Sequence, residues 1–301
     1  MADTASVMEW TVSKNGPVAT IKWTLVEKPL KDFAEHHISF ALAIESVRFD
    51  DTVRVVVITG GDEGGFEIGP QRDQPGKEMP REVMNPATRP GGPSAMVGPW
   101  SLSQGIERTY QALALIEKPV VGRLNGDAYG FAMHLLWGCD VIVADEDARL
   151  GDLHLSLDPM IPYGMSAGDG AFAFMPLFLP PTKLKEFLLL GATWTAKDFA
   201  DMNMINYAVP ASELDTVVNG IVAKFLARPA RALARTKRAA NKRLIEQMNL
   251  TLDYAWMAEA VDCWEIPQRD WKPDTTLRPD DPAWTVTDPN APVDKDPQHG
   301  S

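Results

Sequence analysis

A strand, a glycine turn, a short helix and a second strand follow one another between residues 118 and 151, and this alternation restricts the possible folds more than any other feature of the chain. The two β-branched runs are "KPVVGRLNG" and "DVIVADEDARLG". The apolar stretch between them predicts a helix that carries His134. The same rhythm occurs earlier, where "VRVVVITG" follows a predicted helix over residues 33–47. We therefore expect an α/β protein.

The pattern divides the chain into three parts. Residues 1–190 hold the strand runs and form the expected core, whereas residues 191–265 form a C-terminal helical region, because the sequence from 182 to 264 is almost purely helical in pattern. A proline- and glycine-rich loop over residues 70–100 interrupts the core, and we expect it to act as a lid. Residues 266–301 are an acidic, proline-punctuated tail that cannot build a core by itself.

Composition narrows the range of partners. Hydrophobic residues make up 45% of the 301 residues, which is enough for a sizeable core. The formal net charge of -12 would repel nucleic-acid phosphates and anionic membrane lipids, so we expect no nucleic acid, no membrane and a small hydrophobic substrate. Only two cysteines occur, with neither a signal-peptide pattern nor an apolar run of membrane-spanning length, and this favours a cytoplasmic location.

The sequence carries no motif for a bound cofactor. Neither the HxH nor the HExxH spacing of metal sites occurs. The glycine patterns GxGxxG and GxxxxGK[ST], which cradle nucleotide phosphates, are absent as well. We therefore expect no metal and no cofactor.

Three passages at suitable distances resemble the crotonase, or enoyl-CoA hydratase/isomerase, superfamily. They are "VRVVVITGGDEGGFEIG", "EKPVVGRLNGDAYGFAMHLLWGCDVIVADEDARLG" and "LLLGATWTAKDFADMNMINYAVPASELD", and the resemblance extends over most of residues 10–260. It implies a spiral ββα core, a C-terminal helical region, and assembly as a homotrimer or homohexamer.

The same resemblance shows departures at the chemical positions. Family members that act on CoA thioesters hold the developing oxyanion with two backbone N–H groups. The first donor matches Pro70, which has no N–H, and the second lies in "YGFAM", where Phe131 stands in place of a glycine. Many hydratases also carry carboxylates at the positions that match His134 and His154. These departures favour a different reaction in the same pocket.

One branch of the family, the β-diketone hydrolases that include 6-oxocamphor hydrolase, fits better. The matching features are the histidine in "GDLHLSLD" and the segment "AGDGAFAFMP". The resemblance implies that His154 and Asp169 form a water-activating dyad, and it places His37 near a histidine of that branch. The longer stretch between His154 and Asp169 leaves open whether the two side chains pair.

Physical chemistry suggests roles for these residues. Histidine suits water activation because its usual pKa is closest to neutral. His134 lies about one turn into its helix, where the helix dipole and apolar neighbours disfavour the protonated form, so a neutral imidazole could donate to an oxyanion. Glu67 is a candidate acid beside the expected oxyanion turn, with a solvated loop residue as the alternative. Candidate substrate-binding residues, for several of which a core role is the alternative, are His37, Phe66, Phe131, Trp137 and Tyr163.

Three functions remain open at this stage. The leading hypothesis is a hydrolase that cleaves a carbon–carbon bond of a hydrophobic, cyclic β-diketone by a retro-Claisen reaction without CoA. The nearest rival is a CoA-thioester hydratase, isomerase or lyase with a rebuilt acid–base set. The third is a non-catalytic binding protein that has kept the fold.

Overall fold

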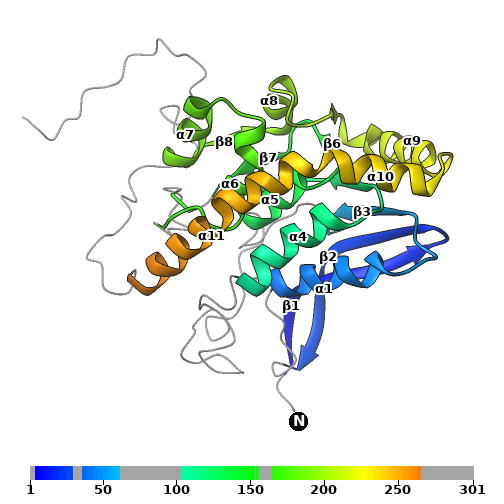
Figure 1. Ribbon diagram of the computed structural model, residues 1–301, viewed down its shortest axis with the longest axis horizontal. Helices are drawn as coiled ribbons and strands as arrows, with labels where there is room; N and C mark the ends of the chain where they lie inside the picture. Colours follow the sequence, from blue (N-terminus) through cyan, green and yellow to red (C-terminus); the bar gives the residue numbers. More distant parts are fainter. Residues whose placement is uncertain (1–3, 30–35, 62–102, 153, 156–164, 266–301) are drawn as a thin grey trace, which may run out of the picture.

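A six-stranded sheet organises the computed structural model, which describes residues 4–29, 36–61, 103–152, 154–155 and 165–265 (Figure 1). The strand order is β1-β2-β3-β4-β6-β9; β1 and β2 are antiparallel, and the other neighbouring strands are parallel. The strands are β1 (Thr4–Asn15), β2 (Val18–Pro29), β3 (Val55–Thr59), β4 (Val120–Leu124), β6 (Val141–Asp145) and β9 (Tyr207–Val209).

The long hairpin β1–β2 begins the sheet. Its two-residue turn contains Gly16 at a φ of 56°, a left-handed conformation that glycine adopts without strain. Trp10 and Trp23 stand opposite each other in the register, with ring centroids 5.2 Å apart, and Phe40 of helix α1 (His36–Arg48) packs edge-on against Trp10. The hairpin is thereby joined to the core by aromatic contacts.

Both faces of the parallel strands are buried. On one face, alternate residues such as Val55 and Val57 pack against Val218 and Ile221 of helix α9 (Leu214–Leu226). The residues between them face the main core on the opposite side. This double burial explains why the sequence of β3 reads as a continuous apolar run rather than an alternating one.

A second, three-stranded sheet carries the residues of the later site. Its order is β5-β7-β8, with β5 (Ala128–Tyr129) parallel to β7 (Arg149–Gly151) and β8 (Thr193–Thr195) antiparallel to β7. Because β5 leads directly into helix α5 (Phe131–Trp137), the strand pairing brings α5 close to the end of β7.

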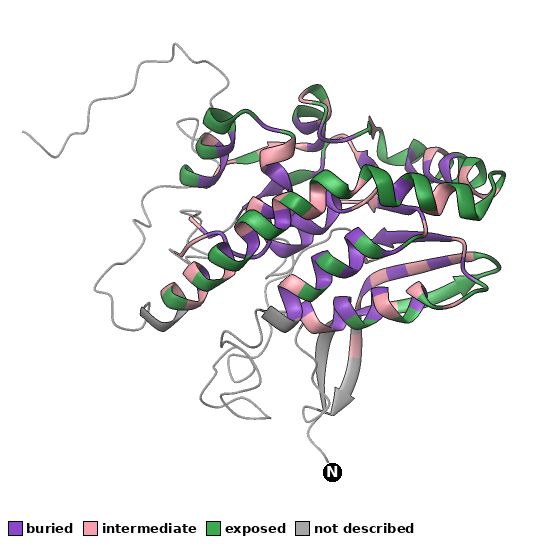
Figure 2. Ribbon diagram, in the orientation of Figure 1, coloured by how far each residue is buried: buried purple, intermediate pink, exposed green. Residues whose placement is uncertain are grey.

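Helices cover the sheets. The C-terminal helix α11 (Lys242–Glu265) packs against α6 (Ala171–Phe174) (Figure 1). Figure 2 shows that the central helices are largely buried, while α9, α10 and α11 expose one side. The remaining helical segments are η3 (Ser103–Glu107), α4 (Arg108–Leu115), η4 (Met175–Leu177), α7 (Pro181–Leu189), α8 (Ala196–Asp201), η5 (Ala211–Glu213) and α10 (Ala230–Ala240).

The α/β class, the strand runs and the helix before β3 are confirmed, but the region 182–264, expected to be almost purely helical, also contains two short strands. Strands β8 and β9 lie in that region and pair with β7 and β6. Both strands are only three residues long, so no periodic pattern could reveal them. No helix of the described residues is long and apolar enough to cross a membrane.

A largely buried ion pair ties α10 to the sheet. Lys237 Nζ lies 2.6 Å from Asp140 Oδ2 and also donates to the carbonyl of Lys118 at 3.0 Å. The same oxygen of Asp140 accepts the backbone N–H of Val120 at 2.7 Å. One carboxylate therefore links the start of β4, the start of β6 and α10.

We predict that Lys237→Met lowers the free energy of unfolding by about 2–4 kcal/mol, because it leaves the carboxylate of Asp140 without its cation. Chemical denaturation followed by circular dichroism measures the change. Lys242→Met, on an exposed position of α11, is the matched control and should change stability by less than about 0.5 kcal/mol. Equal effects of the two substitutions would show that the ion pair contributes nothing.

Candidate active site

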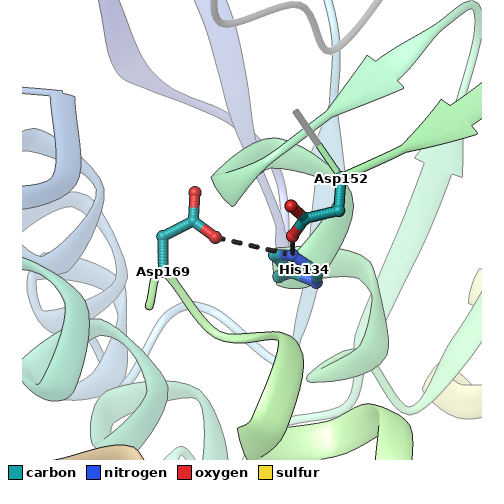
Figure 3. A group of neighbouring side chains, drawn as sticks. All are labelled: His134, Asp152 and Asp169. Carbon is teal, nitrogen blue, oxygen red and sulfur yellow. Dashed lines mark hydrogen bonds and ion pairs between the residues drawn. The ribbon is translucent and has the colours of Figure 1, made fainter. Parts of the chain in front are cut away.

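Four buried ionisable side chains form a closed ring in which imidazoles and carboxylates alternate. His134 Nε2 lies 2.9 Å from Asp152 Oδ2, and His154 Nδ1 lies 2.8 Å from Asp152 Oδ1. Asp169 completes the ring, with Oδ1 at 3.5 Å from His134 Nε2 and Oδ2 at 3.7 Å from His154 Nε2. All four side chains are at most 9% exposed. Figure 3 shows the two carboxylates directed at the imidazole of His134.

The small sheet explains how the first half of this ring forms. The N–H of Gly130 donates to the carbonyl of Gly151 at 3.0 Å, which joins the start of α5 to the end of β7. Gly130 has a φ of 53°, so the chain turns sharply from β5 into α5. His134 then lies on the first turn of α5, and Asp152 follows β7 directly.

A hydrogen bond to its backbone carbonyl fixes the position of Asp169. The hydroxyl of Tyr110, on α4, donates a short hydrogen bond to the carbonyl of Asp169. The next residue, Gly170, has a φ of 127°, and a Cβ atom there would overlap the hydroxyl of Tyr110. Glycine at this position therefore allows both the turn and the tyrosine contact that place Asp169.

Helix α11 adds a fifth ionisable group. Glu259 is 5% exposed, and its Oε1 lies 3.7 Å from His154 Nε2. The loop before Asp169 passes so close to this helix that a Cβ atom on Gly168 would meet the side chain of Glu259. Asp262 anchors the same loop by accepting from the N–H and the hydroxyl of Ser166, both at 2.6 Å.

The charges of the ring shift the pKa values of His154 and Asp152 in the direction opposite to burial. Burial alone would lower the pKa of His154, but the negative charges of Asp152 and Asp169 raise that pKa well above its usual value. Burial alone would raise the pKa of Asp152, but the charge of His154 and the hydrogen bonds from both imidazoles lower it strongly. Burial raises the pKa of Glu259. The ring charges thus favour the protonated form of His154 and the ionised form of Asp152, whereas burial shifts Glu259 toward its neutral form.

The contacts of the ring are short on the side of Asp152 and longer on the side of Asp169, which we call the loose side. Asp152 is fully hydrogen-bonded: besides the two imidazoles, it accepts the backbone N–H of His154 at 3.0 Å. Asp169 Oδ1, in contrast, is buried and makes no hydrogen bond within the part of the chain that the structure describes. Polar groups separated by 3.5–3.7 Å are often bridged by water. The loose side is therefore where a water molecule or a substrate oxygen would bind.

The ring could also hold a metal ion. His134, Asp152 and Asp169 each offer one ligand atom, and these three atoms lie within 4.8 Å of one another.

The other predicted site residues are distributed as follows. His37 is buried, and its ring lies edge-on against Phe131 with centroids 4.3 Å apart. A protonated His37 would lower the pKa of Glu259. Trp137 is buried against Phe199, 5.2 Å between centroids, in the hydrophobic core. The predicted residues outside the described part of the chain are Phe66, Glu67, Pro70 and Tyr163.

Two site residues were missed at the sequence level, Asp152 and Glu259. Asp152 stands two positions before His154, directly after a strand, and its only signal was this proximity. Glu259 continues the buried face formed by Met248, Leu252 and Ala255 at helical spacing. A carboxylate within an apolar helical face is a signal that the pattern contained.

Comparisons with known proteins agree with this architecture. The sequence profile of the enoyl-CoA hydratase/isomerase family matches residues 96–258. A carnitinyl-CoA dehydratase from Salmonella paratyphi B is 26% identical over 205 residues, which cover 67% of this chain and 69% of the relative.

Solved structures share the fold at low sequence identity. An enoyl-CoA hydratase from Mycobacterium avium subsp. paratuberculosis is 21% identical and has a TM-score of 0.64, over 86% of this chain and 96% of its own. A beta-diketone hydrolase from the cyanobacterium Anabaena, bound to (S)-3-oxocyclohexyl acetic acid, is 21% identical and has a TM-score of 0.66, over 86% of this chain and 95% of its own.

We predict that Gly170→Ala displaces the Tyr110 hydroxyl, strains the backbone next to Asp169 and destabilises the protein by about 2 kcal/mol or more. Thermal unfolding provides the measurement. Gly220→Ala is the control, because a Cβ atom there meets nothing within 4 Å and the position lies inside α9. That substitution should stabilise slightly. An unchanged melting temperature for Gly170→Ala would contradict the role given to Tyr110.

We also predict that Asp152→Asn lowers the pKa of His154, because the imidazolium loses its nearest negative charge. Asp169→Asn should lower it by less, since that carboxylate is farther away, at 3.7 Å rather than 2.8 Å. NMR titration of the histidine side chains measures both shifts. Asp253→Asn, at an exposed position of α11, is the control. A pKa of His154 that is indifferent to Asp152→Asn would refute the charge coupling.

Proposed function

Because this chain belongs to the enoyl-CoA hydratase/isomerase family, also called the crotonase superfamily, we propose that its buried ring serves a hydrolytic variant of the family's enolate chemistry. The proposed reaction is retro-Claisen cleavage of a carbon–carbon bond in a hydrophobic, cyclic β-diketone, without CoA. The observation that carries the proposal is the alternating imidazole–carboxylate ring with its loose side at Asp169.

The reaction needs a base, an oxyanion donor and an acid. The oxygen of water bonds to one carbonyl carbon and loses a proton, and the carbonyl oxygen becomes a tetrahedral oxyanion. When that oxyanion collapses, the bond to the carbon between the two carbonyls breaks, and its electron pair leaves as the enolate of the second ketone. Protonation of the enolate carbon gives one carboxylic acid and one ketone, joined in a single chain when the substrate is cyclic.

His154 and Asp169 together take the proton from water in this proposal. Nε2 of His154 and Oδ2 of Asp169 are 3.7 Å apart, a separation that one water oxygen can bridge. On its other nitrogen, His154 is held by Asp152 at 2.8 Å, an arrangement that fixes the ring as an aspartate does in hydrolase triads. The negative charges on both carboxylates raise the pKa of His154, so only its deprotonated form, which is then a stronger base than a free imidazole, accepts this proton.

His134 and Glu259 supply the remaining functions. Nε2 of His134 donates to Asp152 at 2.9 Å and lies 3.5 Å from Asp169 on the loose side of the ring, so its N–H can be shared with an oxyanion that develops there. Burial raises the pKa of Glu259, whose Oε1 lies 3.7 Å from His154 Nε2, so we assign to this carboxyl the return of a proton to the enolate. His37 and Phe131 supply apolar and aromatic surface next to these groups.

The second candidate function is acid–base chemistry on a CoA thioester. It is favoured by the carnitinyl-CoA dehydratase relative, whose name states such an activity. Asp169 and Glu259 would then be the acid–base pair, and the imidazoles would tune them. Calorimetry with acetyl-CoA separates the two functions, because only the second requires CoA to bind.

We predict that the protein opens 2,2-dimethylcyclohexane-1,3-dione to the corresponding keto acid, and that Asp169→Asn lowers kcat by about 100-fold or more, because the water-activating pair loses its carboxylate. The keto acid is quantified by proton NMR. Asp253→Asn on the exposed side of α11 should retain wild-type turnover.

Absence of diketone hydrolysis together with tight binding of acetyl-CoA would replace this proposal with the CoA-dependent one. If neither compound is bound or converted, and substitution of His134, His154 and Asp169 changes only stability, the fold serves a non-catalytic role.

A further inference from the structure

Three ligand-type atoms converge on one point inside the ring, and we propose that they form a binding site for a divalent transition-metal ion of the Zn²⁺ class. One ligand atom each from His134, Asp152 and Asp169 lies within 4.8 Å of the other two. Nε2 of His134 is in contact with Oδ2 of Asp152 and with Oδ1 of Asp169. Figure 3 shows them facing one another from three separate segments of the chain. The ion would bind in competition with the proton on His134 Nε2.

The spacing of these atoms suits a metal ion. With metal–ligand bonds of about 2.0–2.2 Å, neighbouring ligand atoms lie about 3–3.5 Å apart. His134 Nε2 is 2.9 Å from the oxygen of Asp152 and 3.5 Å from that of Asp169. These two separations are those expected around a bound ion, and the carboxylate oxygens of Asp152 and Asp169 lie within 4.8 Å of each other.

The single proton on His134 Nε2 forms a hydrogen bond with only one of the two carboxylates. The N–H of His134 donates to Asp152 at 2.9 Å, whereas Asp169 Oδ1 is buried and without a hydrogen bond among the described residues. A buried carboxylate oxygen that lacks a partner is costly. A dication in place of the proton would contact both oxygens at once and would neutralise more of the negative charge.

The carboxylate oxygens that do not face His134, Oδ1 of Asp152 and Oδ2 of Asp169, both face His154. Asp152 Oδ1 accepts from His154 Nδ1 at 2.8 Å and from the backbone of His154 at 3.0 Å. Asp169 Oδ2 faces His154 Nε2 at 3.7 Å, and Tyr110 holds the backbone of Asp169. Such supporting contacts orient ligand oxygens toward a metal ion and raise its affinity.

The ligand set indicates the kind of ion. One imidazole nitrogen with two carboxylate oxygens suits Zn²⁺, Mn²⁺ or Fe²⁺, whereas Ca²⁺ and Mg²⁺ prefer six or more oxygen ligands. A bound ion would remove the proton from His134 and engage Asp169, so it would inhibit hydrolysis. This inhibition rests on the proposed function, but the binding itself does not.

Isothermal titration calorimetry with Zn²⁺, and absorption spectroscopy with Co²⁺ as a coloured substitute, test the site on the full chain after treatment with a chelator. We expect one tight ion per chain, with Co²⁺ bands in the visible range. His134→Gln and Asp169→Asn should each weaken binding by at least about 10-fold. Asp253→Asn should bind like the wild type, and circular dichroism shows which variants are folded.

The proposal is overturned if the wild type binds no ion, or if folded His134→Gln and Asp169→Asn bind as tightly as the wild type does. Use of two ligand variants keeps the test valid if one of them fails to fold. Metal binding that is lost in the variants, in a protein that hydrolyses no diketone, would support the metal site and reject the hydrolase. Hydrolysis in a protein that binds no Zn²⁺ would support the hydrolase and reject the metal site.

Discussion

The carboxylate of Asp152 has no exposed surface, and the rest of the site depends on how its charge is compensated. A buried carboxylate without partners would be strongly destabilising. Here two imidazoles and one backbone N–H surround it, with contacts of 2.8–3.0 Å. The partners of Asp152 are therefore held in fixed positions, and this fixes the orientation of both His134 and His154.

Strand pairing and helix packing bring the residues of the site together. Pairing of β5 with β7 places the start of α5 beside the end of β7, so His134 and Asp152 meet although they are 18 positions apart. Docking of α11 on the loop before α6 then brings Glu259 to His154. Glycines at positions 168 and 170 permit these close approaches, since a Cβ atom at either place would collide with Glu259 or Tyr110.

The asymmetry of the ring connects this packing with chemistry. The side at Asp152 is saturated with hydrogen bonds and acts as a support. The side at Asp169 has longer contacts and an oxygen without a hydrogen bond from any residue that the structure describes. A water molecule, a substrate oxygen or a metal ion would all be stabilised at that side. The proposed hydrolysis and the proposed metal site thus use the same physical feature, a shortage of donors around Asp169.

The sequence by itself determined the α/β class and the main strands, because apolar periodicity is a local property. Its resemblance to a known family made His134, His154 and Asp169 candidates. The sequence did not reveal β8, β9, Asp152 as the shared partner, or Glu259. Those depend on strand pairing and helix docking between residues far apart in the chain. Only the tertiary structure decided that two histidines share one buried carboxylate, because desolvation and charge act through space rather than along the sequence.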